Sequence, residues 1–377
     1  MSKVKLGEVA IEHKETCKGS KDGYPIVGLE HLVSEEVTLT AWDEGSDNTF
    51  TKMFRKGNVL FGRRRAYLKK AAVAPFDGIC SGDITVIEAI PDRILPELLP
   101  FIIQNDELFD FAVGKSAGSL SPRVKWEHLK NYEFELPDMG KQRELAELLW
   151  AMDATKKSYQ KLIAATDELV KSQFIERFGK PGTDPFRWGL TTLGKCCELN
   201  PRKPKGINTD DSYSFVAMPS VSEDGRIDAS VERPYSEVCK GFTYFAENDV
   251  LFAKITPCME NGKGGVAKGL KNGVGFGSTE FHVLRPIKGV SDPYWLYIIT
   301  MFSKFRSDAE KVMTGTGGQR RVPITYLSEY SITLPPIELQ EQFAAFVRQS
   351  DKSKFELEQA LSELTATYKR IIAENLG

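Results

Sequence analysis

The side chains that could bind a ligand gather in a few short segments. One spans residues 61–70 and reads Phe-Gly-Arg-Arg-Arg-Ala-Tyr-Leu-Lys-Lys. Three consecutive arginines cannot all lie on one face of a strand, so part of this run must point outward. A guanidinium group can grip a phosphate or bind the O6 and N7 edge of guanine with two hydrogen bonds. The run is therefore a candidate for contact with DNA, the alternative being an ordinary solvated charge run.

Three further segments have a similar character. Residues 254–263 are basic at both ends, and residues 114–123 and 314–321 are loops of small and polar residues that also contain Arg or Lys. Small residues let backbone amides approach phosphates, while Ser, Thr, Gln and Arg offer hydrogen bonds to base edges. The alternative for each loop is a flexible connection without a ligand. From all four segments we predict DNA contact by Arg63, Arg64, Arg65, Tyr67, Lys69, Lys115, Ser116, Ser119, Ser121, Arg123, Lys254, Thr256, Asn261, Lys263, Thr316, Gln319, Arg320 and Arg321.

Motifs of several enzyme classes are missing from the sequence. A DNA methyltransferase needs an Asn/Asp-Pro-Pro-Tyr/Phe motif to hold a flipped base, whereas residues 292–294 carry a single proline. Residues 263–269 approach a phosphate-binding loop but lack its final Gly-Lys-Ser/Thr. The six cysteines form no Cys-x-x-Cys pair and the four histidines are scattered. We therefore predict no catalytic residue and no metal site on this chain.

Composition and charge narrow the class of protein. The chain has 377 residues, 41% hydrophobic and 27% charged, with a formal net charge of −2. This balance excludes a uniformly basic coat but permits local basic patches. No apolar run approaches the roughly 18 residues of a membrane span, and the first residues lack the apolar core of a secretory signal. We expect a cytoplasmic protein that does not contact membranes.

The chain repeats itself. Segments 6–7, 59–61 and 123–124 match segments that lie 187, 191 and 198 residues further along. From residue 123 onward the offset stays at 198, as in the pairs Tyr132 with Tyr330 and Gln142 with Gln340. The drift indicates small insertions in loops of the second copy. The sequence therefore predicts two tandem copies of a module of roughly 190 residues.

Within each copy the pattern changes from strands to a long helix. Segments 59–61, 84–87, 250–252 and 281–284 are rich in β-branched and aromatic residues, which is typical of strands. Short helices are expected at 95–111 and 294–309. After a proline, each copy enters a long proline-free stretch, and from 141 to 176 a helix would extend about 54 Å.

Apolar residues recur in these two stretches with the 3–4 alternation of a coiled coil. A helix this long needs a partner for its apolar stripe, and the other copy supplies an equivalent helix. The alternative is two independent amphipathic helices, each packed on its own module. We predict coiled-coil or subunit-docking roles for Leu145, Leu148, Met152, Tyr159, Leu162, Leu169, Phe343, Phe346, Leu357, Leu364 and Ile371.

In these features the whole chain resembles the specificity (S) subunits of type I restriction-modification systems. The resemblance rests on the repeat and on the order of several phrases, among them Gly-Arg-Arg-Arg-Ala-Tyr-Leu-Lys-Lys at 62–70, Phe-Ala-Lys-Ile-Thr-Pro at 252–257, Gly-Ser-Thr-Glu-Phe at 277–281 and Gly-Gly-Gln-Arg-Arg-Val-Pro at 317–323. Copy one departs from the family pattern, because it has Ser-Gly-Asp at 81–83 where copy two has Ser-Thr-Glu at 278–280. The role of Asp83 is therefore open.

The resemblance implies an α+β fold with two target-recognition domains of short strands and helices. They would be separated by two long helices that form an antiparallel coiled coil, with an internal pseudo-twofold repeat. The implied boundaries are 1–140 and 181–338 for the target-recognition domains, and 141–180 and 339–377 for the conserved spacer helices.

The resemblance also implies a non-catalytic subunit that recognises a two-part asymmetric site in double-stranded DNA. Two methyltransferase (M) subunits would dock on the helices, and restriction (R) subunits would join if the system cleaves DNA. S-adenosylmethionine, ATP and Mg would bind to these partners, with no cofactor on this chain. A different hypothesis is a scaffold whose two β-rich modules bind protein and whose helices form a dimerisation coiled coil.

Overall fold

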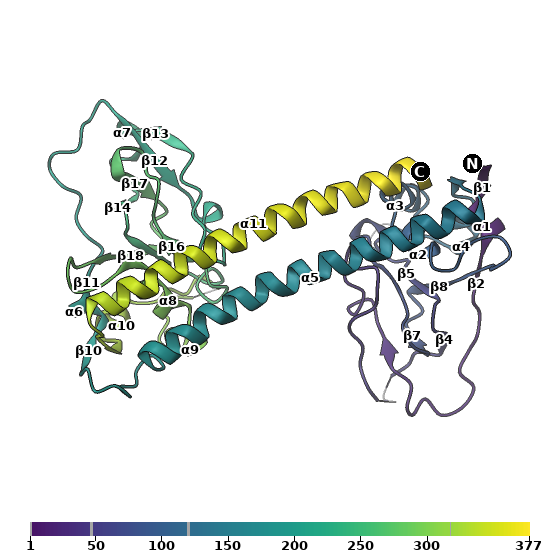
Figure 1. The fold of residues 1–377 in the computed structure, drawn as a ribbon, viewed down its shortest axis with the longest axis horizontal. Coiled ribbons are helices and arrows are strands. Elements are labelled where there is room, and N and C mark those ends of the chain that lie inside the picture. The colour runs from purple at the N-terminus through teal and green to yellow at the C-terminus, as the bar shows by residue number, and fades with distance from the viewer. Residues whose placement is uncertain (1, 46–47, 119–120, 317) are drawn as a thin grey trace. The chain divides into compact units, whose positions relative to one another are not determined.

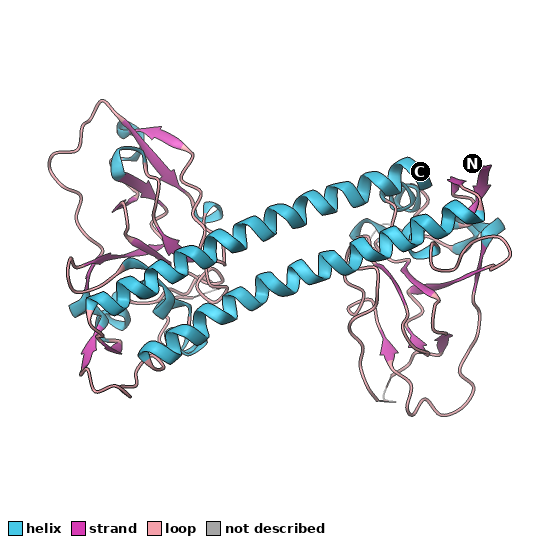
Figure 2. Cartoon of the chain, in the orientation of Figure 1, coloured by secondary structure: helices cyan, strands magenta, loops and turns pink. Residues whose placement is uncertain are grey.

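The computed structural model describes residues 2–45, 48–118, 121–316 and 318–377. The chain forms two compact units. Unit 1 holds Met1–Leu162 and Leu357–Gly377, and unit 2 holds Ile163–Glu356. Both units combine short strands with helices (Figure 2), so the predicted α+β class is confirmed.

Unit 1 contains three small sheets. The first pairs β1 with β9, the second has the strand order β2-β8-β5-β6, and the third has the order β3-β7-β4. The strands are β1 (Ser2–Lys5), β2 (Ala10–Glu12), β3 (Ile26–Val27), β4 (Lys52–Phe54), β5 (Val59–Gly62), β6 (Ala71–Val73), β7 (Gly78–Cys80), β8 (Ile84–Ala89) and β9 (Glu133–Leu136). The helices are α1 (Leu6–Val9), η1 (Ala66–Leu68), α2 (Leu99–Ile103), α3 (Asp106–Gly114), α4 (Trp126–Leu129) and the first part of α5 (Met139–Phe178).

Unit 2 has corresponding sheets. The strand β10 pairs with β19, and the two larger sheets have the orders β11-β18-β15-β16 and β13-β12-β17-β14. The strands are β10 (Leu190–Thr192), β11 (Cys197–Leu199), β12 (Ser212–Val216), β13 (Glu232–Pro234), β14 (Thr243–Ala246), β15 (Val250–Ala253), β16 (Gly264–Val266), β17 (Val274–Gly277), β18 (Phe281–Pro286) and β19 (Ser331–Thr333). The helices are α6 (Leu193–Cys196), η2 (Met218–Ser220), α7 (Tyr235–Val238), η3 (Lys271–Gly273), α8 (Pro293–Met301), α9 (Ser303–Lys311), α10 (Ile324–Glu329) and the first part of α11 (Ile337–Leu376).

The two units share most of their sheet topology, which confirms the internal repeat, and β13 is an additional edge strand in the sheet β13-β12-β17-β14 of unit 2. The sheet β2-β8-β5-β6 and the sheet β11-β18-β15-β16 join equivalent strands in the same antiparallel order. The central strands β5 and β15 are buried along their whole length. This is why their sequences are continuous apolar runs without alternation.

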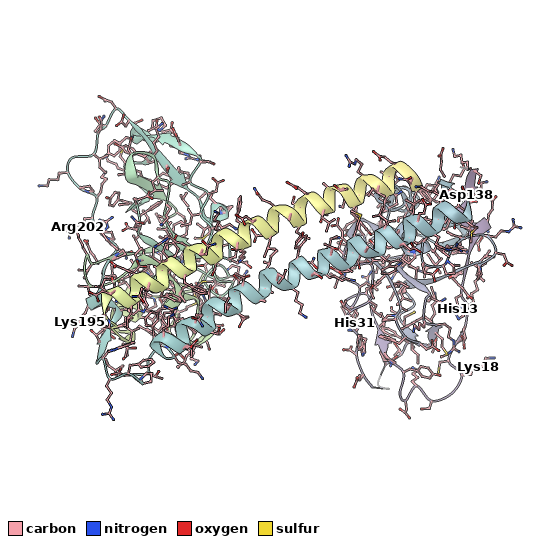
Figure 3. All side chains as sticks on the ribbon, viewed as in Figure 1. His13, Lys18, His31, Asp138, Lys195 and Arg202 are labelled. Carbon is pink, nitrogen blue, oxygen red and sulfur yellow. The ribbon has the colours of Figure 1, made fainter. Side chains whose placement is uncertain are left out.

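The long helices begin where the sequence interrupts the preceding strand. Pro137 ends the extended segment before α5, and Asp138, labelled in Figure 3, follows it. Asp138 Oδ1 accepts a hydrogen bond from Lys141 N at 3.0 Å. This bond satisfies one of the free amides of the first helical turn. It also lowers the pKa of the Asp138 carboxyl group.

A buried glutamine fixes the start of each long helix to its own unit. Gln142 Oε1 accepts from Leu95 N at 2.8 Å, and Gln340 Oε1 accepts from Asp292 N at 3.0 Å. Each side chain also donates to the carbonyl of the proline five residues before it, at 2.8 Å and 2.9 Å. Both glutamines are almost fully buried, and their hydrogen bonds offset the cost of burying an amide. The same polar contact therefore anchors α5 in unit 1 and α11 in unit 2.

The two long helices, labelled in Figure 1, pack antiparallel within each unit. In unit 1 the early α5 residues Leu145 and Met152 share a core with the late α11 residues Tyr368 and Ile372. The ring of Tyr368 also lies 4.9 Å from Lys156 Nζ. The first turns of α5 therefore lie beside the last turns of α11.

Unit 2 shows the reverse arrangement. The late α5 residues Phe174 and Phe178 contact the early α11 residue Phe343, with ring centroids 5.5 Å and 5.4 Å apart. Edge-to-face contacts of this kind stabilise aromatic clusters beyond the area that they bury. The predicted antiparallel coiled coil is confirmed by these two sets of contacts.

On α5 one row of the predicted coiled-coil or subunit-docking residues lies outside the seam between the helices, and its docking role stays a prediction. Leu148, Leu162 and Leu169 have side chains that are 45%, 51% and 48% exposed, whereas Leu149 and Val170 are buried. The buried row follows Leu145, Leu149, Met152 and onward, so it advances by four residues and then by three. The sequence pattern had predicted a step of three residues, from Leu145 to Leu148, and then a step of four residues to Met152. Both spacings occur on one helix face, and tertiary packing selects between them.

The remaining seam residues lie as follows. Leu145, Met152 and Phe343 are buried, while Tyr159, Phe346, Leu357, Leu364 and Ile371 are half-buried. The helices span 139–178 and 337–376, and the predicted boundaries of the target-recognition domains stay predictions. Within the described residues, none of the helices has both the length and the apolar character needed to cross a bilayer.

Replacing Leu149 with Ala is expected to lower the free energy of unfolding by about 3 kcal/mol, because the side chain is fully buried and leaves a cavity. The neighbouring change Leu148→Ala is expected to cost less than about 1 kcal/mol, because that side chain is 45% exposed. Urea unfolding of both full-length variants measures the difference. Equal losses would show that the seam is assigned incorrectly.

Candidate nucleic-acid interface

In unit 1 the arginine run lies directly beside the loop that precedes Val124. Arg65 N donates to Pro122 O at 2.9 Å, and Val124 N donates to Arg63 O at 3.0 Å. Arg65 adopts the left-handed conformation with φ of 55°, which turns the chain sharply after β5. Two segments that are almost sixty residues apart are thus brought together, as DNA contact by both requires.

Side chains join the same two segments. Arg123 forms two hydrogen bonds with Asp83, from Nε to Oδ1 at 2.7 Å and from Nη2 to Oδ2 at 3.2 Å. Arg64 Nε donates to Ser121 Oγ at 2.7 Å, and its Nη1 lies 3.6 Å from Asp83 Oδ2. The hydrogen bonds from Arg123 hold the pKa of Asp83 below its usual value, against the opposing effect of burial.

Unit 2 repeats this arrangement with different side chains. Thr256 N donates to Arg320 O at 3.0 Å, and Val322 N donates to Lys254 O at 2.9 Å. Arg321 bonds Glu280 from Nε at 2.8 Å and from Nη2 at 2.7 Å. The pKa of Glu280 is lowered, first by its hydrogen bonds to Arg321. The pKa of Lys254 is lowered because burial disfavours its charged form.

A buried arginine donates hydrogen bonds to the backbone of the loop 254–263 in unit 2. Arg306 on α9 is 7% exposed and donates from Nη1 to Met259 O and from Nη2 to Gly262 O, the latter at 3.2 Å. Burial lowers its pKa to about 10. The equivalent residue in unit 1 is Leu108, which is fully buried, and unit 1 has a shorter connection at this place. Arg306 therefore supports an insertion that only copy two carries.

Sequence reasoning missed Arg306, Asp83 and Glu280 as parts of the site. The offset between the copies is 191 at Val59 and 197 at Ser81, and this growth signalled insertions between the two matched segments. Nothing in the local sequence pairs Asp83 with Arg123, because forty residues separate them.

Some predicted contact residues form bonds within their own unit, and others are exposed to solvent. Lys69 Nζ is bonded to Asp106 at the start of α3, and Lys263 Nζ donates to Met218 O at 3.4 Å. Lys115 lies over the Phe111 ring. The exposed members of the set are Arg65, Tyr67, Lys115, Asn261, Thr316 and Gln319. Ser119 lies outside the described residues.

Residues 114–118 have the letters of a Gly-x-Ser-x-Gly nucleophile motif. That motif needs a strand before it and a helix after it. Here the segment follows the helix α3, and Ser116 Oγ donates to Ala112 O at 2.8 Å. The segment is therefore the end of a helix and does not have the geometry of a nucleophile elbow. Among the described residues, no group of three or more His, Cys, Asp or Glu side chains is placed to hold a metal ion.

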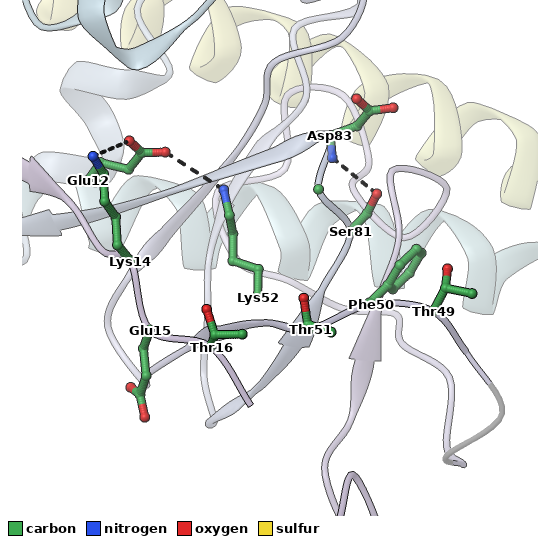
Figure 4. Close-up of a pocket in the computed structure, with 11 residues that line it drawn as sticks. Glu12, Lys14, Glu15, Thr16, Thr49, Phe50, Thr51, Lys52, Ser81 and Asp83 are labelled. Carbon is green, nitrogen blue, oxygen red and sulfur yellow. Dashed lines mark hydrogen bonds and ion pairs between the residues drawn. The ribbon is translucent and has the colours of Figure 1, made fainter. Parts of the chain in front are cut away.

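A polar cavity of about 600 Å³ opens in unit 1 beside Asp83 (Figure 4). Its lining combines hydroxyl groups, which donate and accept hydrogen bonds, with charged groups of both signs. Lys52 Nζ donates to Ile84 O at 2.8 Å and lies 3.8 Å from Glu12 Oε1. The lining residues are Glu12, Lys14, Glu15, Thr16, Thr49, Phe50, Thr51, Lys52, Ser81, Gly82 and Asp83. Sequence analysis did not identify this cavity, because its residues come from three separate segments, 12–16, 49–52 and 81–83.

Residues 1–165 and 187–365 match the type I restriction modification DNA specificity domain. The match covers most of the chain and both copies of the repeat. The chain belongs to this family. The resemblance inferred from the sequence is thereby confirmed.

Individual relatives agree with this assignment. The chain is 36% identical over 201 residues to the specificity subunit of the type I restriction enzyme EcoAI from Escherichia coli, with 52% of this chain and 34% of the relative covered. It is 40% identical over 159 residues to the EcoEI specificity subunit from the same organism, with 42% and 26% covered. The matches span about a third or less of these curated relatives.

A solved structure shares the fold of this chain. A chain from a study of complex assembly and conformational transition in a type I restriction-modification system matches with a TM-score of 0.58 and 21% identity. The match covers 99% of this chain and 97% of that chain.

Replacing Arg306 with Leu is expected to lower the free energy of unfolding by about 2 kcal/mol or more, because two backbone carbonyls lose their donor. Leucine is the residue at the equivalent place in unit 1, so its size suits the fold. Lys304→Leu, an exposed change on the same helix, should have little effect. Urea unfolding compares the two variants, and unchanged stability of Arg306→Leu would show that the loop does not depend on this side chain.

Proposed function

We propose that this chain is the DNA specificity subunit of a type I restriction-modification complex. Each unit would recognise one half of a two-part asymmetric site in double-stranded DNA. The observation that carries the proposal is the same arrangement in both units. In each, a basic turn is joined by equivalent hydrogen bonds to a loop of small and polar residues, while the exposed side chains differ. A shared frame with different contact residues suits two half-sites of different sequence.

The chain would act without a catalytic centre of its own. Two methyltransferase subunits would dock on the repeated structure, because two equivalent surfaces suit two copies of one partner. Restriction subunits would join if the system cleaves DNA. S-adenosylmethionine, ATP and Mg would then serve the partners. The family match supports this function and gives no support to the protein-binding scaffold.

Exposed leucines on α5 support a docking role for this helix. Leu148 in unit 1 and Leu169 in unit 2 are 45% and 48% exposed on α5. Apolar side chains at such positions are typical of surfaces that a protein partner covers.

Deletion of the gene is expected to abolish N6-methyladenine at one split DNA motif in the host genome, because the complex would lose its sequence recognition. Exchanging residues 1–140 for those of another family member should change only one half of the motif. Single-molecule sequencing of genomic DNA measures both effects. An unchanged methylation map, in cells that express this chain and a methyltransferase partner, would contradict the proposed function.

Leu148→Glu is expected to weaken association with the methyltransferase subunit at least about tenfold, because a buried carboxylate at an interface is costly. Ala154→Glu adds the same charge at an exposed position on another face of α5 and serves as the matched control. Co-purification and titration calorimetry of the full-length chains measure the association. Equal affinities for both variants would place the docking surface elsewhere.

A further inference from the structure

We propose that the pairs Asp83–Arg123 and Glu280–Arg321 are positioning devices for DNA recognition. Each pair would hold one loop against one basic turn, so that Arg123 and Arg321 position the recognition surface and do not contact bases themselves. The inference rests on the proposed function and assigns a different role to two arginines that the sequence pattern had placed among the DNA contacts.

The first argument is that the same bond recurs in both units. In each pair the arginine uses Nε and Nη2, and both carboxylate oxygens accept, at 2.7 Å and 3.2 Å in unit 1 and at 2.8 Å and 2.7 Å in unit 2. Two parallel hydrogen bonds fix the direction of a guanidinium group as well as its place. The bond is kept although Asp83 is one methylene shorter than Glu280. The two copies therefore retain the contact through a change of side chain.

The second argument is the set of segments that each pair joins. The residue that bears the carboxylate also accepts from the basic turn through its own carbonyl, Asp83 O from Arg63 N at 3.0 Å and Glu280 O from Lys254 N at 2.9 Å. Each carboxylate residue in turn donates its amide to a serine hydroxyl two residues earlier, at 3.2 Å in both units. The start of β8 or β18 is thus tied both to the basic turn and to the loop.

The arginine end of each pair closes the base of its loop. Ala117 and Arg123 exchange two backbone hydrogen bonds, at 3.1 Å and 3.0 Å, and Thr314 and Arg321 do the same at 3.0 Å and 2.8 Å. The carboxylate accepts hydrogen bonds from the arginine side chain at this loop base. Loss of the carboxylate would loosen the loop base, although backbone bonds such as that from Val124 N to Arg63 O would still join it to the turn.

The third argument concerns the donors that the pair occupies. Guanine is bound by an arginine fork that offers two neighbouring N–H groups at once. Asp83 and Glu280 already accept from Nε and Nη2 of their arginines. The side-on fork of each arginine is thus occupied, and in unit 2 Arg321 Nη1 also donates to Gln319 O at 3.0 Å. Exposed side chains of the same segments, such as Arg65 and Gln319, are better placed for base contacts. These residues differ between the copies, as recognition of two different half-sites requires.

The exposure of the pairs makes the idea testable without loss of the fold. The side chains of Asp83 and Glu280 are 21% and 24% exposed, and those of Arg123 and Arg321 are about 40% exposed. Ion pairs so open to solvent contribute little to global stability. Their effect is therefore expected on the placement of the loops.

The test compares Asp83→Asn and Glu280→Gln in cells that carry the wild-type partners. Asp83→Asn is expected to raise methylation about tenfold at sites with one mismatch in the half-site of unit 1, within the range of a single base-pair mismatch. Glu280→Gln should relax only the other half-site. Asp77→Asn is the matched control, because Asp77 pairs with Arg55 in unit 1 away from the loop, and it should leave the motif unchanged.

Three results would overturn the proposal. Relaxation by Arg123→Gln but not by Asp83→Asn would show that Arg123 contacts bases directly. Relaxation of both half-sites by one variant would show a general loss of structure. Unfolding of both Asp83→Asn and Glu280→Gln would show that the pairs support the fold, contrary to their exposure.

A second readout separates this inference from the proposed function. Hydrogen exchange of the purified full-length chain is expected to speed up about tenfold at the amides of Ala117, Arg123 and Val124 in Asp83→Asn, and not in Asp77→Asn. A tenfold change corresponds to about 1.4 kcal/mol in local stability. If wild-type cells show no split motif, the proposed function fails, and this exchange still decides whether the pair holds the loop.

Discussion

The structure depends on the burial of the apolar faces of two 40-residue helices. A helix of this length cannot bury its stripe by itself, and each unit therefore uses parts of both. The core of unit 1 includes Ile372 and Leu376 from the end of α11, and the core of unit 2 includes Phe174 and Phe178 from the end of α5. Neither copy, taken as a stretch of sequence, contains all the residues of its own core.

This constraint explains why polar contacts at the helix starts are buried and repeated. Each long helix begins in one unit and contributes its last residues to the core of the other. Its first turn must therefore start at a fixed residue, so that the later residues occupy the correct packing positions. Gln142 and Gln340 fix that place by bonding a proline carbonyl behind them and a backbone amide from the loop before α2 or α8. An apolar residue could fill the space but could not select one register, because apolar contacts are not directional.

Much of the fold could be predicted because it follows from local pattern. The strands at β5, β8, β15 and β18 are marked by β-branched and aromatic residues, and the long helices carry a strong periodic signal. The choice between Leu148 and Leu149 for the seam could not be made, since both lie near one helix face and only the partner helix decides. The pairing of Asp83 with Arg123 and the burial of Arg306 were equally inaccessible, because each depends on segments brought together by the fold.

The site thereby divides into a frame and a variable surface. The frame consists of what both units keep, which is the buried glutamine, the exchanged backbone bonds at the loop base and the carboxylate–arginine pair. The surface consists of what they change, including Arg65 in one unit and the insertion around Asn261 in the other. The insertion needs its own support, and Arg306 provides it where unit 1 has Leu108. On the proposed function, contacts that fix position would thus be kept apart from those that choose a base. A substitution at the surface would then alter recognition while the loop that carries it stays in place.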